Sequence, residues 1–286
     1  MRVTDDPKTL VSTAWLAAHL DDPDLRILDA SWHMPAAGRD AKAEFEAWHI
    51  PGARFFDIDA VSDQASDLPH MAPSAQEFAR HMAALGISAD QQVVIYDQSA
   101  TRSAARAWWT FRLMGHDKVA VLDGGLAKWL EEARDVSTDP TEVEAADYRP
   151  SRRAELVRDA AQVAAASATG DEHIVDARAA DRFRGDAPEP RAGLASGHIP
   201  GSRNLPFGQI YNSDGTMKDT KTLRALFEGA GIDLSRPVIT SCGSGVTAAS
   251  LSLALERLGH KTHSLYDGSW TEWGALPNAN IATGDA

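Results

Sequence analysis

Residues 240–248 read Thr-Ser-Cys-Gly-Ser-Gly-Val-Thr-Ala and contain the single cysteine of the chain, Cys242. The apolar run Pro237-Val238-Ile239 precedes them and an Ala-, Leu- and Ser-rich segment follows, which predicts a strand, a tight glycine loop and a helix. Such a loop surrounds one sulfur with backbone N–H groups and the positive end of a helix dipole, which both stabilise a thiolate. The pattern favours a reactive thiol; the alternative is a buried, inert cysteine.

The composition limits the classes of function. A chain of 286 residues is long enough for two domains of ordinary size. Its formal net charge of −13 argues against a general nucleic-acid or anionic-membrane surface, so an anionic substrate would need locally placed arginines. One cysteine excludes an internal disulfide, a Cys-rich zinc cluster and a Cys-x-x-Cys redox pair. No stretch resembles a signal peptide or reaches transmembrane length, and we expect a soluble, cytoplasmic protein.

The two halves of the chain carry the same landmarks in the same order, which indicates an internal duplication. The matched landmarks are Ile27–Ala30 with Ile174–Ala177, His49–Gly52 with His198–Gly201, and Asp123–Gly124 with Asp267–Gly268. A polar segment that includes Pro140 and Pro150 separates the halves and predicts a linker. We therefore predict an N-terminal domain over residues 1–138, a linker over 139–152 and a C-terminal domain over 153–286.

Each copy alternates β-rich runs with helical patterns. In the first copy the predicted strands are Arg26–Leu28, Gln92–Tyr96 and Lys118–Leu122, and the predicted helices include Gln76–Leu85 and Thr101–Met114. This alternation is typical of an α/β fold, in which helices cover both faces of a parallel β-sheet. Sites in such sheets form at the carboxyl ends of the strands, where Cys242 would lie.

The duplication places Asp97 opposite Cys242, so the first copy has the fold without the thiol. We interpret Asp97 as a helix N-cap; a catalytic carboxylate is the alternative. His49 and His198 are predicted to stabilise turns, because each copy has one whereas only one copy has the nucleophile.

Taken together, these residues resemble the tandem-domain rhodaneses. The family's two signatures are matched by Phe45-x-x-x-His49-Ile50-Pro51-Gly52-Ala53 and by Asp267-Gly268-Ser269-Trp270-Thr271-Glu272-Trp273. The resemblance covers nearly the whole chain. It implies two tandem rhodanese-like domains, of which the first is catalytically inactive and the second carries the catalytic cysteine.

The cysteine loop indicates the subfamily. Residues 242–248 are similar to the loop of 3-mercaptopyruvate sulfurtransferases, whereas thiosulfate sulfurtransferases typically carry two basic residues directly after the cysteine. Thiosulfate is a dianion that benefits from cations beside the sulfur, while mercaptopyruvate carries its charge on a more distant carboxylate. The resemblance implies transfer of sulfur from 3-mercaptopyruvate through a persulfide on Cys242 to cyanide or a thiol such as reduced thioredoxin, without cofactor or metal. It assigns Gly243, Gly245, Val246 and Thr247 to substrate binding.

The resemblance also assigns polar side chains outside the loop. Arg182 and Arg191 would hold the carboxylate and carbonyl oxygens of the substrate, a task suited to the guanidinium fork. A solvated surface is the alternative for this arginine-rich region, and it is the interpretation we give to Arg178 and Arg184.

A relay of Asp59, His70 and Ser244 is implied by the same resemblance. Asp59 would orient the imidazole of His70, which would polarise Ser244 toward the substrate carbonyl. Alternatively, Asp59 caps a helix and His70 only hydrogen-bonds a loop.

Three other functions are alternatives to a 3-mercaptopyruvate sulfurtransferase. A thiosulfate sulfurtransferase is the nearest. A cysteine phosphatase would need an arginine at position 248, where this chain has Ala248. The intact glycine loop argues against a non-enzymatic rhodanese-like binding module.

Overall fold

The computed structural model describes residues 5–285, which form two compact units. Unit 1 contains the described residues up to Gln64, Ala72–Arg153 and Asn212–Met217. Unit 2 contains Ala65–Met71, Ala154–Tyr211 and the described residues from Lys218 onward. The short segment that carries His70 therefore belongs with the C-terminal half of the chain.

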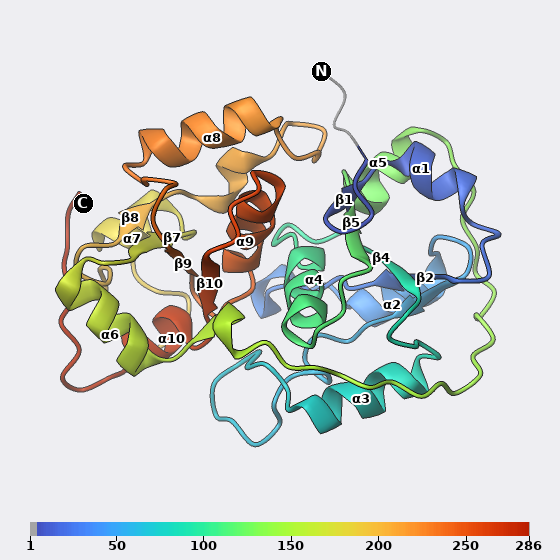
Figure 1. Cartoon of the computed structure of the whole chain (residues 1–286), viewed down its shortest axis with the longest axis horizontal. Helices are drawn as coiled ribbons and strands as arrows, with labels where there is room; N and C mark the ends of the chain where they lie inside the picture. The colour runs from blue at the N-terminus through green and yellow to red at the C-terminus, as the bar shows by residue number, and fades with distance from the viewer. Residues whose placement is uncertain (1–4, 286) are drawn as a thin grey trace. The chain divides into compact units, whose positions relative to one another are not determined.

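Unit 1 is built on one parallel sheet of five strands in the order β1-β5-β4-β2-β3 (Figure 1). Its strands are β1 (Leu10–Val11), β2 (Leu25–Asp29), β3 (Ala53–Phe55), β4 (Gln92–Tyr96) and β5 (Val119–Leu122). Its helices are α1 (Thr13–Ala18), α2 (Ala41–Ala47), α3 (Ala75–Ala84), α4 (Ala104–Leu113) and α5 (Gly125–Glu131), with a 3₁₀ turn η1 (Pro35–Ala37).

Helices cover both faces of this sheet, as the sequence predicts. On one face, Val94 and Tyr96 of β4 pack in a buried cluster with Leu16 of α1 and Trp129 of α5. Successive side chains of a strand point to opposite faces, so the intervening residues of β4 face the side on which α4 packs. There Phe78 of α3 packs edge-on against Phe111 of α4.

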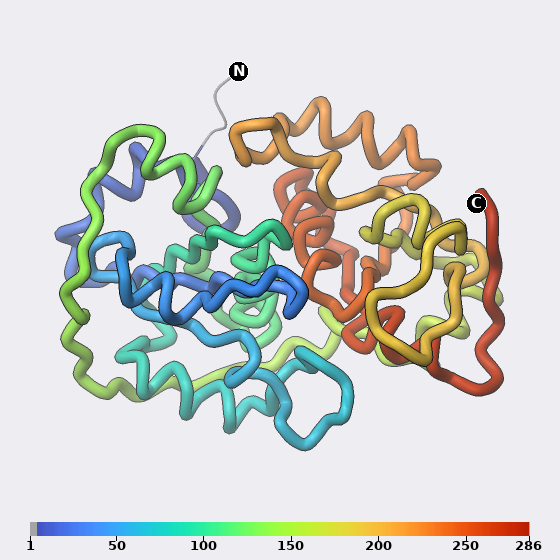
Figure 2. The backbone as a smooth tube through the Cα atoms, turned by 180° about the vertical axis from the view of Figure 1, so that it is seen from behind, coloured from blue at the N-terminus to red at the C-terminus, as the bar shows by residue number. Residues whose placement is uncertain are grey.

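Unit 2 repeats this architecture strand by strand, in the order β6-β10-β9-β7-β8. Its strands are β6 (Val157–Arg158), β7 (His173–Asp176), β8 (Arg203–Asn204), β9 (Val238–Ser241) and β10 (His263–Tyr266). Its helices are α6 (Ala160–Thr169), α7 (Ala180–Arg184), α8 (Thr220–Gly229), α9 (Ala248–Arg257) and α10 (Ser269–Trp273), with 3₁₀ turns η2 (Ala154–Leu156) and η3 (Phe207–Ile210). The α/β fold and the duplication are confirmed, and Figure 2 follows the chain through both units.

The predicted element boundaries differ from the observed ones by a few residues at most. Strand β4 spans Gln92–Tyr96 as predicted, but α4 begins at Ala104 rather than Thr101. The reason is local, because Arg102 has a φ of +53°, which lies outside the right-handed helical region.

The predicted linker, residues 139–152, contains neither helix nor strand. It is part of unit 1 and is hydrogen-bonded to other segments of that unit: the N–H of Ala146 donates to the carbonyl of Ala83 at 3.1 Å, and that of Ser151 to the carbonyl of Met114 at 2.8 Å. Within residues 5–285, no helix has the length and apolar character needed to cross a bilayer.

Candidate functional site

Cys242 lies where the carboxyl end of β9 turns toward α9. Strand β9 is paired with β7 on one side and β10 on the other, so its end lies in the middle of the sheet. The Cys242 side chain is buried, with 1% exposure. Gly245, with a φ of +77°, supplies the left-handed conformation that turns the loop toward α9. The predicted strand, glycine loop and helix are confirmed.

The peptide groups of the loop are oriented by α10. The carbonyl of Cys242 accepts the N–H of Trp270 at 2.9 Å, and the carbonyl of Gly243 accepts the N–H of Thr271 at 2.8 Å. In a trans peptide the C=O and the following N–H point in opposite directions, so the N–H groups of Gly243 and Ser244 point away from α10. Because α10 occupies only the carbonyl side of these peptides, their donors are left for an incoming group.

These donors make the loop a receptor for negative charge. Among the residues that the structure describes, no acceptor takes the N–H groups of Gly243, Ser244, Val246 or Thr247. Several backbone N–H groups around one point stabilise an anion, especially next to a helix N-terminus such as that of α9. The loop can therefore stabilise charge on the sulfur of Cys242 or on a bound sulfur.

His70 and Ser244 are brought together within unit 2. The His70 Nδ1 and the Ser244 Oγ share a hydrogen bond of 3.1 Å, and both side chains are buried. His70 has a φ of +62°, an uncommon conformation for a residue other than glycine. Asp59 lies in unit 1 on the loop after β3, where its carboxylate accepts the indole N–H of Trp32 at 3.0 Å. The interaction of Asp59 with His70 stays a prediction.

Arg182 lies on α7, close to the cysteine loop. A Cβ placed on Gly243 would lie 3.4 Å from the Arg182 Nη2, so the guanidinium is adjacent to the residue that follows the cysteine. Arg182 is also paired with the buried carboxylate of Glu189. Arg191 is partly exposed and forms no ion pair with any residue in the described range. Its approach to Cys242 stays a prediction.

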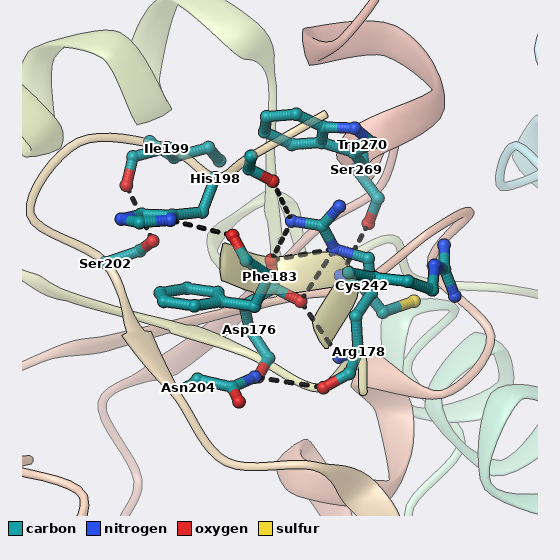
Figure 3. A network of polar contacts seen from close by, with 12 residues as sticks. Asp176, Arg178, Phe183, His198, Ile199, Ser202, Asn204, Cys242, Ser269 and Trp270 are labelled. Carbon is teal, nitrogen blue, oxygen red and sulfur yellow. Dashed lines mark hydrogen bonds and ion pairs between the residues drawn. The ribbon is translucent and has the colours of Figure 1, made fainter. Parts of the chain in front are cut away.

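Arg178 corrects the prediction of a solvated side chain. Its guanidinium is buried, donates to Asp176 Oδ2 and to Glu189 Oε1 at 2.7 Å each, and lies 4.2 Å from the ring of Trp270. Figure 3 shows it between Asp176 and Trp270. Burial is the largest influence and lowers the pKa of Arg178, but the carboxylates of Asp176 and Glu189 together raise it above its ordinary value. Two buried carboxylates offset the cost of burying this cation.

Arg184 differs from Arg178 and fits the prediction of a surface residue. Its partner is Asp186, and both side chains are at least a third exposed.

Glu189 is a residue that the sequence reasoning missed. Its side chain is 2% exposed, and it joins the buried Arg178 to Arg182 at the cysteine loop. No local signal in the sequence distinguishes Glu189 from a surface carboxylate, because its role depends on the burial of Arg178.

Ser269 and Thr271 were missed as well. The Ser269 Oγ accepts the N–H of Cys242 at 3.2 Å, as Figure 3 shows, and the Thr271 Oγ1 donates to the carbonyl of Gly243 at 2.6 Å. Comparing the two copies position by position could have singled out both residues, since Gly125 and Ala127 replace them in the first copy.

The counterpart of the cysteine in unit 1 is a capping residue. The carboxylate of Asp97 accepts the N–H of Ser99 at 3.0 Å and that of Ala104 at 2.7 Å. Burial raises the pKa of Asp97, while these two hydrogen bonds lower it. The N-cap residue of α4 is Ser103, so Asp97 caps this helix from six residues upstream and not as the N-cap residue itself, which corrects the N-cap interpretation.

His49 and His198 play the same structural part in the two units. Each ring donates through Nδ1 to a backbone carbonyl, that of Phe45 or that of Phe183, and stacks on the ring of the same phenylalanine. Among residues 5–285, no cluster of histidine, cysteine or carboxylate side chains has the arrangement of a metal site.

Comparison with known proteins shows that the chain matches the rhodanese-like family. The model of the rhodanese-like domain matches residues 12–132 and 159–276. The chain is 43% identical to the 3-mercaptopyruvate sulfurtransferase of Rattus norvegicus over 93% of this chain and 92% of the relative. It is 42% identical to the thiosulfate sulfurtransferase of Bos taurus, again over 93% of this chain and 92% of the relative. The crystal structure of SseA from Escherichia coli, described as a 3-mercaptopyruvate sulfurtransferase structure with the rhodanese fold, superposes with a TM-score of 0.84 at 40% identity, covering 91% of this chain and 98% of SseA.

Proposed function

The chain belongs to the rhodanese-like family, and from this premise we propose that it is a sulfurtransferase whose donor is 3-mercaptopyruvate. The resemblance to the tandem rhodaneses that the sequence predicts is thereby confirmed. The choice of 3-mercaptopyruvate as the sulfur donor rests on the loop from Cys242 to Ala248. In this loop, backbone N–H groups and Ser244 surround the cysteine, and no basic side chain follows it.

The first half of the reaction loads the cysteine. The Cys242 thiolate attacks the sulfur of 3-mercaptopyruvate, and the carbon–sulfur bond breaks with its electron pair moving to carbon. Pyruvate leaves as its enolate, which takes up a proton to become pyruvate. The enzyme keeps the sulfur as a persulfide on Cys242.

The geometry of unit 2 supports roles for the loop N–H groups, for Ser244 with His70 and for Arg182, whereas the roles of Arg191 and Asp59 follow from the family resemblance. The N–H groups of Gly243 and Ser244, which point away from α10, would stabilise negative charge on the transferred sulfur. Ser244, hydrogen-bonded to His70, would polarise the substrate carbonyl as the enolate develops. Arg182, and with it Arg191, would bind the substrate carboxylate. Asp59 would complete the relay by orienting His70.

The second half of the reaction unloads the sulfur. The chain has one cysteine, so the persulfide has no internal thiol that could resolve it. An external thiolate, as in reduced thioredoxin, or cyanide attacks the outer sulfur. The sulfur–sulfur bond breaks, the acceptor becomes a persulfide or thiocyanate, and the Cys242 thiolate is regenerated.

Thiosulfate is the second candidate donor, because the bovine relative with 42% identity is a thiosulfate sulfurtransferase. The arrangement of cations argues for mercaptopyruvate. Residues 243–248 contain no lysine or arginine, and the nearby Arg182 is already paired with Glu189. A dianion beside Cys242 would then face only one adjacent, partly neutralised guanidinium.

A two-donor assay tests this proposal. We expect kcat/KM for 3-mercaptopyruvate to exceed that for thiosulfate by about a hundredfold or more, a difference of about 3 kcal/mol in transition-state stabilisation. Preference for thiosulfate would overturn the choice of donor. Cys242→Ser should abolish pyruvate release while the thermal unfolding profile stays that of the wild type.

Mass spectrometry distinguishes an enzyme from a binding module. After incubation with 3-mercaptopyruvate without acceptor, the wild type should gain about 32 Da on Cys242 as a persulfide, and the Cys242→Ser variant should not. A wild type that binds the donor without gaining sulfur would be a non-enzymatic module.

We further propose that the protein is located in the cytoplasm. Fractionation of the native cells would test this location.

A further inference from the structure

Two hydroxyl groups bond to peptide groups of the cysteine loop, one to the Ser241–Cys242 peptide and one to the Gly243–Ser244 peptide. The Ser269 Oγ accepts the N–H of Cys242 at 3.2 Å and donates to the carbonyl of Tyr266 at 2.7 Å. The Thr271 Oγ1 donates to the carbonyl of Gly243 at 2.6 Å, beside the N–H of Thr271, which donates to the same oxygen at 2.8 Å. Ser269 is fully buried, as are Cys242 and Tyr266.

The other copy of the fold provides an internal comparison. In unit 1 the N–H of Leu126 donates to the carbonyl of Asp97 at 3.0 Å, which matches the bond from Trp270 to Cys242. The residues on either side of Leu126 are Gly125 and Ala127, which have no hydroxyl group. The backbone contact is thus common to both copies, while the two hydroxyls occur only in the copy that carries the thiol.

Ser269 and Gly125 both have a left-handed backbone conformation, but only Ser269 has a side chain that makes this conformation unfavourable. Gly125 adopts a φ of +60° at the matched position, which costs a glycine nothing. Ser269 adopts a φ of +49°, a conformation that is unfavourable for a residue with a Cβ. A strained residue that persists in a buried position is compensated by its surroundings, and such residues concentrate at functional sites. Here the compensation consists of the two hydrogen bonds of the Ser269 hydroxyl.

We propose that Ser269 and Thr271 are positioning residues that fix the peptide groups around Cys242, so that the N–H groups of Gly243 and Ser244 stay on the side away from α10, where they can stabilise a charged sulfur. Because the peptide is planar, holding the carbonyl of Gly243 holds the N–H of Ser244 in the opposite direction. Holding the N–H of Cys242 likewise fixes the peptide that precedes the nucleophile. Donors oriented before the reaction stabilise an anion better than donors that must first reorient.

The inference rests on the proposed function for its catalytic readout, but its main test needs no sulfur donor. Alkylation of Cys242 by iodoacetamide follows the thiolate and can be measured from pH 5 to pH 10. In Thr271→Val and in the double variant S269G/T271A, we expect the half-maximal rate to move up by about one pH unit, and the rate at pH 6 to fall about tenfold. On the high-pH plateau the rates should converge with the wild type, because the plateau reports the ionised thiol in every variant.

Conservative variants separate positioning from simple loss of packing. Thr271→Ser keeps the hydroxyl and should restore the alkylation profile relative to Thr271→Val. Ser252→Ala removes another buried hydroxyl, whose hydrogen-bond partner is Thr240 Oγ1 at 2.9 Å and not a peptide group of the loop. This variant should have a lower free energy of unfolding and an unchanged alkylation profile. The double variant uses the residues that unit 1 itself carries at these positions, so it keeps the assay open if Thr271→Val fails to fold.

Steady-state kinetics with 3-mercaptopyruvate provide the second readout. The double variant should lose about tenfold in kcat, with KM within about twofold of the wild type, since the loop is expected to act on the reacting sulfur rather than on the carboxylate. Alkylation profiles of both hydroxyl-lacking variants that coincide with the wild type would overturn the proposal. So would an equal shift in Ser252→Ala. Absence of mercaptopyruvate turnover in the wild type would refute the proposed donor and leave the alkylation result standing.

Discussion

At the scale of single residues, the four arginines between residues 178 and 191 divide into a buried one, a bridging one and two that are partly exposed. Arg178 is fixed inside unit 2 by two carboxylates, whereas Arg182 shares Glu189 with it and reaches the residue after the cysteine. Glu189 therefore fixes the position of Arg182 and at the same time reduces its effective charge. Such a side chain suits a monoanionic carboxylate better than a dianion at the sulfur.

Alanine substitutions test which arginines bind the substrate. Arg182→Ala should raise KM for 3-mercaptopyruvate about tenfold to a hundredfold, because a charge-assisted pair with the carboxylate is lost. Arg191→Ala should act in the same direction. Arg184→Ala is the matched control on the same helix, since Arg184 pairs with Asp186 at the surface, and its KM should stay that of the wild type. Unchanged kinetics in either of the first two variants would remove that residue from the site.

These residues also mark the limit of what the sequence can predict. The cysteine loop, its glycines and the strand before it follow from local patterns, and the structure confirms all three. The prediction for Arg178 is wrong because an arginine-rich stretch has the composition of a solvated surface, and its burial depends on Trp270, far along the chain. The bond between His70 and Ser244 depends on the segment 65–71 belonging with unit 2, which no local pattern encodes.

At the scale of elements, β2 and β7 end in aspartates whose environments differ. Asp176, at the end of β7, is paired with Arg178. Asp29, at the end of β2, is buried with no cationic partner among the described residues, and its Oδ2 has no hydrogen-bond partner there. Burial is the largest influence and raises the pKa of Asp29 to about 6, against hydrogen bonds from Ser31 that lower it.

This difference predicts a pH dependence of stability. In the folded protein Asp29 retains its proton up to about pH 6, whereas the ordinary pKa of an aspartate is 3.8. The protonated side chain therefore contributes fully to the free energy of unfolding below pH 3.8, and this contribution is lost as the pH rises through 6. At pH 8 the ionised side chain costs the folded state roughly 3 kcal/mol. Asp29→Asn should therefore raise the free energy of unfolding at pH 8 by about 1–2 kcal/mol and change it little at pH 4.

The matched substitution in the other copy should have the opposite sign. Asp176→Asn removes one of the two carboxylates that offset the buried Arg178, and should lower the free energy of unfolding by about 3 kcal/mol. Urea unfolding at pH 4 and pH 8 measures both variants. An Asp29→Asn variant less stable than the wild type at pH 8 would contradict the argument.

At the scale of the whole molecule, the duplication separates the fold from the chemistry. Both sheets have the same strand order. Asp97 follows β4 and Cys242 follows β9, each at the point where the chain turns toward the next helix. The chain places a thiol at this point in unit 2 and a carboxylate in unit 1. The duplication is recoverable from sequence because its landmarks are turns and strand ends. The hydrogen bonds that distinguish the two loops require a structure.

The comparison predicts that a thiol alone does not create a second site. In a Cys242→Ser background, Asp97→Cys places a sulfur at the matched position of unit 1, but the loop after it has no glycine, and Gly125 and Ala127 supply no hydroxyl. The substitution also removes the carboxylate that accepts the N–H groups of Ser99 and Ala104, which should lower the free energy of unfolding by about 1–2 kcal/mol.

Incubation of this variant with 3-mercaptopyruvate, followed by mass spectrometry, should show no gain of about 32 Da at position 97, whereas wild-type Cys242 gains it. Iodoacetamide should alkylate the thiol introduced at position 97 more slowly than wild-type Cys242 at pH 6. A persulfide formed at position 97 at a rate near that of Cys242 would mean that the parallel sheet and helix dipole suffice, and that the glycine loop with its hydroxyl contacts is dispensable.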